Sequence, residues 1–116
     1  MQLEYSELDN GIRLIRLIGV LDMNGTYAIE VEFVRRCAGE NVRVLVDLSQ
    51  VSYISSIGIP MLVNSARSVA RHGGKMVLLS PQKSVESILE LAGVPLIIPI
   101  YYDLDTVISE LKKEIS

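Results

Sequence analysis

Short apolar strands alternate with amphipathic helices along this chain of 116 residues, and few architectures accommodate that order. Val42–Leu48 and Lys75–Leu79 are predicted strands on either side of a helical pattern at Ile57–Arg71. The central run Val44–Val46 is apolar at every position, which is typical of a strand buried on both faces. Repeated strand–helix–strand order predicts right-handed crossovers and a mostly parallel sheet covered by helices.

The N-terminal segment adds an antiparallel portion to this sheet. Gln2–Ser6 and Ile12–Ile18 are predicted strands. Asp9-Asn10-Gly11 between them is a strong turn signal, since Asn and Gly tolerate a positive φ. We therefore expect the two strands to form a hairpin.

The first predicted helix runs from Asn24 to Cys37. Its apolar positions Tyr27, Val31 and Val34 recur at helical spacing, and Asn24 is suited to cap its N-terminus. The lone cysteine at its end is expected to be a small buried side chain, because free cysteine is among the most buried residue types.

The second predicted helix, Ile57–Arg71, is amphipathic. His72-Gly73-Gly74 should end it, because glycine accepts the left-handed geometry of a helix C-terminus. Its inward face is predicted to hold Leu62, Ala66, Val69 and Ala70.

The C-terminal part is predicted to hold a helix at Ser84–Leu91, a short strand at Leu96–Ile100 and a final helix at Asp103–Ile115. Asp103 or Asp105 can cap the final helix. Its apolar stripe consists of Leu104, Val107, Ile108, Leu111 and Ile115. The elements together predict an α/β fold in one domain over residues 1–116, with a mixed, mostly parallel sheet of about five strands and about four helices.

Composition narrows the class of function. Hydrophobic residues make up 49% of the chain and charged residues 22%, as in an ordinary globular domain. The 11 Lys and Arg residues are scattered and the formal net charge is −3, so we expect no nucleic-acid partner. The longest apolar run, Val94–Tyr102, is too short to span a bilayer. With one cysteine and no signal-peptide pattern, the expectation is a cytoplasmic protein without membrane insertion.

Side chains that could carry catalysis do not converge in the sequence. The one histidine, His72, lies in a predicted helix-ending turn, and a lone histidine cannot build a zinc site. Gly73-Gly74-Lys75 precedes a strand, whereas a phosphate-binding loop must precede a helix. We therefore expect no catalytic residue, no metal and no cofactor, and a protein that is not an enzyme.

A pair of serines marks the start of the second predicted helix. Ser55 and Ser56 come just before it, and Pro60 fits its first turn, where the missing N–H costs nothing. Either serine could simply cap the helix, as serine favours at that position. Either could instead accept a phosphate, whose charge of about −1.5 to −2 would lie beside the positive helix end. Position alone favours the cap and leaves both interpretations open.

Around this pair the sequence resembles the STAS domain family, in particular the bacterial anti-sigma factor antagonists. The central match is Val46–Gly58, which is similar to the family's Asp-Leu-Ser signature ending in a serine and a glycine. Gly19–Asp22 resembles its Gly-x-Leu-Asp segment, and Gly73–Leu79 and Leu89–Gly93 are similar to its C-terminal half. The resemblance covers nearly the whole chain.

The resemblance implies a partner-switching cycle. The unmodified protein would bind an anti-sigma factor that is also a serine protein kinase, and phosphorylation of Ser56 would release it. A PP2C-type serine phosphatase would then reset the cycle. Ser55 is the alternative phosphoacceptor. The surface that would bind the partner consists of Asp22, Ser55, Ser56, Ile57, Gly58, Ile59 and Pro60.

Two other functions compete with this one. A STAS module that does not switch would serve as a scaffold or as an accessory subunit of a transporter. A small-ligand or nucleotide sensor is the third hypothesis, and the missing phosphate-binding glycine loop disfavours it.

Overall fold

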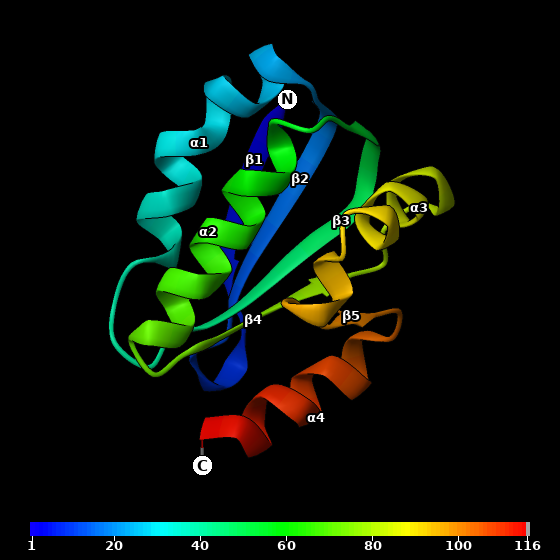
Figure 1. Ribbon diagram of the computed structural model, residues 1–116. Helices are drawn as coiled ribbons and strands as arrows, with labels where there is room; N and C mark the ends of the chain where they lie inside the picture. Colours follow the sequence, from blue (N-terminus) through cyan, green and yellow to red (C-terminus); the bar gives the residue numbers. More distant parts are fainter. Residues whose placement is uncertain (116) are drawn as a thin grey trace.

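The chain folds into one five-stranded sheet flanked by four helices, as seen in a computed structural model that describes the backbone of residues 1–115 and the side chains of residues 1–112 (Figure 1). The strands lie in the order β1-β2-β3-β4-β5, with β1 antiparallel to β2 and all other neighbours parallel. The predicted mixed, mostly parallel α/β fold is thus confirmed. The strands are β1 Gln2–Glu7, β2 Arg13–Leu21, β3 Arg43–Ile54, β4 Lys75–Leu79 and β5 Ile100–Tyr101, and the helices are α1 Met23–Cys37, α2 Gly58–Arg71, α3 Lys83–Leu91 and α4 Leu104–Ile115.

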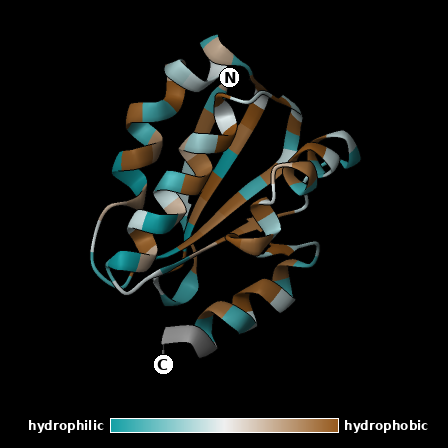
Figure 2. Cartoon of the chain, in the orientation of Figure 1, coloured by the Kyte–Doolittle hydropathy of each residue, from teal (hydrophilic) through white to brown (hydrophobic). Residues whose placement is uncertain are grey.

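The helices form two unequal layers on the sheet. The larger core lies between one sheet face and helices α1, α2 and α3, and Phe33 and Leu62 are fully buried in it. The smaller core lies on the opposite face, where Val107 and Leu111 of α4 pack on Leu45 and Val77. Figure 2 shows the hydrophobic residues concentrated on the strands between these layers. Because β3 is covered on both faces, its Val44–Val46 run is buried as predicted.

The N-terminal hairpin is confirmed. A single 3-10 turn at Asp9–Gly11 joins β1 to β2, and Asn10 and Gly11 have φ values of 70° and 78°. The register pairs Tyr5 with Ile15 and Glu7 with Arg13. Asn and Gly tolerate this left-handed backbone, which is why the turn could be read from the sequence.

The three apolar positions whose spacing predicts the first helix do not face the sheet. Tyr27, Val31 and Val34 are 61%, 80% and 52% exposed. The buried side of α1 is lined by Gly25, Thr26, Ile29, Phe33 and Cys37. Helix α1 therefore carries two apolar stripes, and a helical period by itself does not say which of them faces the sheet. The N-cap is also Asp22 and not the predicted Asn24.

Strand β3 is six residues longer at its C-terminal end than the predicted Val42–Leu48. The pairing with β2 slips between Arg16 and Ile18 and again between Gly19 and Val20, and each slip places an additional residue in β3. Such bulges break the two-residue alternation of a strand. The segment therefore looks like a loop in the sequence, although it pairs along its length.

The prediction that the last strand begins at Leu96 is wrong, because β5 begins at Ile100. Val94–Leu96 form a 3-10 turn that contains Pro95, and only Ile100 and Tyr101 pair with β4. Pro99 has no N–H to donate to a ladder, so regular pairing begins only after it.

The C-terminal end of α2 and the N-terminal end of α4 follow the predicted signals. Helix α2 ends at Arg71, with the cap residue His72 followed by Gly73 at φ 80°. Of its predicted inward residues, Ala70 is instead exposed. Asp103 caps α4 by accepting a hydrogen bond of 3.0 Å from Thr106 N. Leu104 is 42% exposed, and the side chain of Ile115 lies outside the described residues.

Cys37 is buried at the end of α1, as predicted. Burial raises the pKa of the Cys37 thiol from 9.0 to about 12, against the opposing charge of Arg13. At pH 8 we therefore expect iodoacetamide to alkylate the folded protein at least ~100-fold more slowly than the urea-unfolded chain, because the thiolate is the nucleophile. Mass spectrometry of timed samples measures both rates.

A double variant, Cys37→Ser with Ser109→Cys, is the matched control, since Ser109 is exposed on α4. Its thiol should react at the same rate in the folded and unfolded states. Equal rates for Cys37 in both states would contradict the raised pKa.

In the described part of the chain, no helix is both long and apolar enough to cross a membrane.

Candidate functional site

The residues predicted to bind a partner come together at the carboxyl edge of the parallel strands. Strand β2 ends at Leu21 and turns through Asp22 into α1, and β3 ends at Ile54 and turns through Ser55 into α2. A hydrogen bond of 2.9 Å from Ser55 N to the carbonyl oxygen of Leu21 joins the two turns. Ligand sites of open α/β sheets form at this edge, because the loops after neighbouring strands meet there.

Asp22 shapes the first turn. Its Oδ1 accepts a hydrogen bond of 2.7 Å from Gly25 N, and its carbonyl oxygen accepts one of 2.9 Å from Thr26 N. Gly25 is buried, and an added Cβ there would overlap the carbonyl oxygen of Val20. The glycine thus lets α1 begin directly against the end of β2, while Asp22 stays exposed beside the serine turn.

Ser55 has the structural role in the second turn. Its Oγ accepts a hydrogen bond of 3.2 Å from Ile57 N, and its carbonyl oxygen accepts bonds from Gly58 N and Ile59 N of 3.1 and 3.4 Å. The residue is half-buried. Ser55 therefore holds the turn before α2 by a side-chain bond to the backbone two residues on, and it does not cap the helix, whose N-cap is Ile57.

Ser56 lies differently from its neighbour. It is exposed in the turn, one residue before Ile57, the residue that precedes the first turn of α2. Pro60 is also exposed, and Ile57 and Ile59 are half-buried. Neither serine is the N-cap of α2, which is Ile57, so the cap interpretation is wrong. Ser55 instead stabilises the turn through its Oγ, and Ser56 is exposed to solvent.

Gly58 differs from the other predicted surface residues because it is buried. An added Cβ would lie 3.1 Å from Ile54 Cγ1 and 3.2 Å from Leu21 Cβ. These contacts are tight, so the glycine lets the first turn of α2 approach both strand ends. It positions the serine turn and does not itself offer a side chain.

Exposed apolar residues border the two turns and were not singled out in the sequence. Val20 and Tyr53 are register partners on β2 and β3 and are 37% and 48% exposed. Met23, the first residue of α1, is 53% exposed. Large exposed apolar side chains beside a polar turn are typical of a surface that binds another protein. Only the β3 bulges, which the sequence does not reveal, bring Tyr53 opposite Val20.

Asp47, inside the resemblance motif, has a structural role. Its side chain is 10% exposed, and Oδ2 accepts a hydrogen bond of 3.1 Å from Arg16 Nε. Oδ1 accepts one of 2.9 Å from Ser49 N, at the first bulge of β3. The aspartate therefore holds the bulge that directs the end of β3 toward the serine turn.

Among the side chains that the structure describes, residues 1–112, no group of three or more His, Cys, Asp or Glu is arranged to hold a metal ion. His72 is exposed, and its Nδ1 lies 2.8 Å from the carbonyl oxygen of Ser68.

Comparison with known proteins bears on the serine turn. A family model described as the STAS domain matches residues 6–107. A candidate anti-sigma factor antagonist of Thermotoga maritima is 29% identical over 72 residues, which are 62% of this chain and 64% of that protein, so the match spans less than two thirds of its length. BtrV of Bordetella bronchiseptica, also a candidate anti-sigma factor antagonist, is 27% identical over 100 residues, which are 86% of this chain and 85% of that protein.

Solved structures share the architecture. An anti-sigma factor antagonist from Mycobacterium paratuberculosis superposes with a TM-score of 0.81 at 19% identity, covering 96% of this chain and 93% of the other. The anti-sigma factor antagonist SpoIIAA in its unphosphorylated form superposes at 0.78 with 16% identity and 97% of each chain covered. Phosphorylated SpoIIAA from Bacillus superposes at 0.67 with 16% identity, covering 94% and 98%. At these identities the likeness establishes the fold alone.

Proposed function

The chain belongs to the STAS domain family, and from that premise we propose that it is an anti-sigma factor antagonist that works by partner switching. It binds an anti-sigma factor with serine kinase activity when unmodified, and phosphorylation of Ser56 releases it. A PP2C-type phosphatase restores the unmodified form. In this cycle the chain is a substrate and a binder and not an enzyme. Its extent as one domain over residues 1–116 stays a prediction, since the family model covers residues 6–107.

The exposure of Ser56 carries this proposal. A kinase must reach the hydroxyl of its acceptor, and Ser56 is exposed, whereas Ser55 is half-buried and its Oγ accepts a hydrogen bond from the backbone. The relatives named as candidate anti-sigma factor antagonists support the same class of partner. Asp22, Pro60 and the apolar residues Met23 and Tyr53 surround the turn and form the proposed docking surface.

A phosphate on Ser56 would act on the partner more than on the fold. The group adds about −1.5 to −2 charges, and the start of α2 carries a partial positive charge that tolerates an anion. The domain should therefore stay folded after modification. A partner seated on the turn would have to bury the dianion or withdraw, and burying an unpaired charge is costly.

Phosphosite mapping tests the assignment directly. We expect the cognate anti-sigma kinase, incubated with ATP, to modify wild type and the Ser55→Ala variant, and to leave Ser56→Ala unlabelled. Tandem mass spectrometry of the tryptic peptide identifies the modified residue. Both variants must give the circular dichroism spectrum of wild type, so that loss of labelling reports the acceptor and not unfolding. Full labelling of Ser56→Ala with loss in Ser55→Ala would transfer the role to Ser55.

A further inference from the structure

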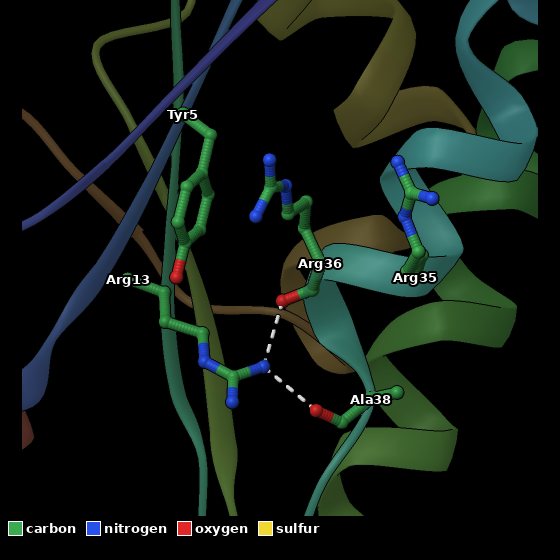
Figure 3. Close-up of a pocket in the computed structure, with 5 residues that line it drawn as sticks. All are labelled: Tyr5, Arg13, Arg35, Arg36 and Ala38. Carbon is green, nitrogen blue, oxygen red and sulfur yellow. Dashed lines mark hydrogen bonds between the residues drawn. The ribbon is translucent and has the colours of Figure 1, made fainter.

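Three arginines converge on a hollow at the opposite end of α1 from Asp22. Arg13 is the first residue of β2, and Arg35 and Arg36 lie in the last turn of α1. Together with Tyr5 and Ala38 they line a cavity of about 240 Å³. Figure 3 shows Tyr5 and Arg13 extending from the strands and Arg36 extending toward them from the helix, while Arg35 runs along α1 on the side away from Tyr5. The function proposed for the serine turn does not involve these side chains.

The hollow has an excess of positive charge. Arg35 and Arg36 both pair with Glu32, and the Arg36 Nε to Glu32 Oε1 distance is 2.8 Å. These hydrogen bonds, with Arg35 the stronger contributor, hold the pKa of Glu32 below its usual value, so the carboxylate is charged at neutral pH. Arg13 instead donates to two neutral carbonyl oxygens. The residues that line the cavity thus include three guanidinium groups and no carboxylate, although Glu32 pairs with two of the arginines and Glu7 is the cross-strand partner of Arg13.

The arginines are also oriented for binding. The guanidinium carbon of Arg36 lies 4.1 Å from the centroid of the Tyr5 ring, which fixes its plane by cation–π stacking. Arg13 Nη1 donates to the carbonyl oxygens of Arg36 and Ala38, at 2.9 and 2.7 Å. That contact covers the negative end of α1, which would otherwise repel an anion. The Nη2 group of Arg13 and both Nη groups of Arg36 take no part in these bonds, so they can donate to a ligand.

We propose that this hollow binds a phosphate group, as inorganic phosphate or as the terminal group of a small phosphate monoester. A dianion suits a lining with three guanidinium groups, and a tetrahedral oxyanion offers the paired oxygens that these groups recognise. The cavity is smaller than the ~300–1,000 Å³ typical of sites for drug-sized ligands, which suits a small ion. The Tyr5 hydroxyl adds one more hydrogen-bonding group at the wall.

The test is an NMR titration of the ¹⁵N-labelled full chain at pH 7.5 and constant ionic strength. Inorganic phosphate and O-phosphoserine are added in separate arms, and sodium chloride replaces them in the reference arm. We expect saturable shifts of the arginine Nε–Hε signals and of the amides of residues 35–38 with phosphate, and none with chloride. If only phosphoserine saturates, the ligand is an ester, and if both saturate equally, the free phosphate group suffices.

Variants locate the site. Arg36→Gln and Arg35→Gln should each weaken phosphate binding about tenfold, the effect of losing one charge-assisted contact. Arg35 is the safer variant for folding, because its side chain is 71% exposed and bonds only Glu32 among the described residues. Arg67→Gln, an exposed arginine on α2, is the matched control and should bind as wild type does. Shifts that do not saturate, or equal losses in all three variants, would overturn the proposal. Ser56→Ala should bind phosphate normally, so this test is independent of the switch.

Discussion

Replacing Ser56 by glutamate is expected to weaken binding of the anti-sigma partner about 100-fold or more, whereas Ser56→Ala should change the affinity less than about threefold. Glutamate places a permanent negative charge at the exposed turn, where a docked partner would have to desolvate it. Charge placed badly in an interface costs several kcal/mol, and about 2.7 kcal/mol corresponds to 100-fold. Alanine removes only the Ser56 hydroxyl, which makes no hydrogen bond to the described residues, so the fold and the docking surface remain.

Isothermal titration calorimetry of the purified proteins gives these affinities. Ser109→Glu is the matched control, because it makes the same change at an exposed serine on α4, on the opposite side of the sheet from α2. That variant should bind as wild type does. If Ser56→Glu binds with the wild-type affinity, the electrostatic switch is wrong even if Ser56 is phosphorylated. If Ser109→Glu loses as much affinity, net charge and not the turn determines binding.

The second large effect is expected at Gly25, where alanine should destabilise the protein by about 3 kcal/mol or more. Alanine is favoured over glycine inside a helix by about 1 kcal/mol, so an exposed glycine would gain from the change. At Gly25 the added Cβ would overlap the Val20 carbonyl oxygen, which is backbone and cannot rotate away. Helix α1 or the end of β2 must then shift, and overpacking of this kind typically costs 1–3 kcal/mol even where side chains can adjust. A loss of this size is a large part of the 5–15 kcal/mol typical of a folded domain.

Urea denaturation followed by circular dichroism measures this loss as a lower midpoint. Two variants in the same turn serve as controls for the size of this loss of stability. Asn24→Ala is exposed in the same turn and should change stability by less than about 0.5 kcal/mol. Asp22→Ala removes the hydrogen bond to Gly25 N and should cost about 1 kcal/mol. If Gly25→Ala unfolds at the midpoint of Asn24→Ala, the close contact between α1 and β2 is not as tight as the structure indicates.

Helices α1 and α2, which lie on the same face of the sheet, show when the apolar period of a helix predicts its buried side. In α2, the apolar residues Leu62, Ala66 and Val69 repeat on one side only, and that side is buried as predicted. In α1, Tyr27 and Val31 also recur at helical spacing, but both are exposed to solvent. The two helices differ because α1 begins very close to the end of β2. The first buried turn of α1 therefore consists of Gly25 and Thr26, which are not hydrophobic enough to mark the buried side in the sequence.

Local rules were also sufficient for the hairpin turn and for most helix ends, because Asn, Gly and Asp act on the backbone next to them. They were insufficient for β3. Its bulges lie where the pairing with β2 shifts register, next to the bond between Asp47 and Arg16. Both the pairing and the bond involve residues some 30 positions away in the chain. The arginine hollow has the same origin, since Arg36 on α1 is 23 residues from Arg13 and meets the hairpin only in the folded chain.

The sequence alone determined the α/β class, the order of the elements and the serine pair at the start of α2, because each of these depends on neighbouring residues and on their period. Position alone left Ser55 and Ser56 open as a cap or a phosphoacceptor, and the family resemblance selected Ser56 as the phosphoacceptor. Tertiary structure gave them different surroundings: the bond from Ser55 N to Leu21 and the burial of Gly58 orient the turn so that Ser55 Oγ accepts a bond from Ile57 N and Ser56 is exposed. That orientation depends on contacts between two strand ends that are more than thirty residues apart in the chain.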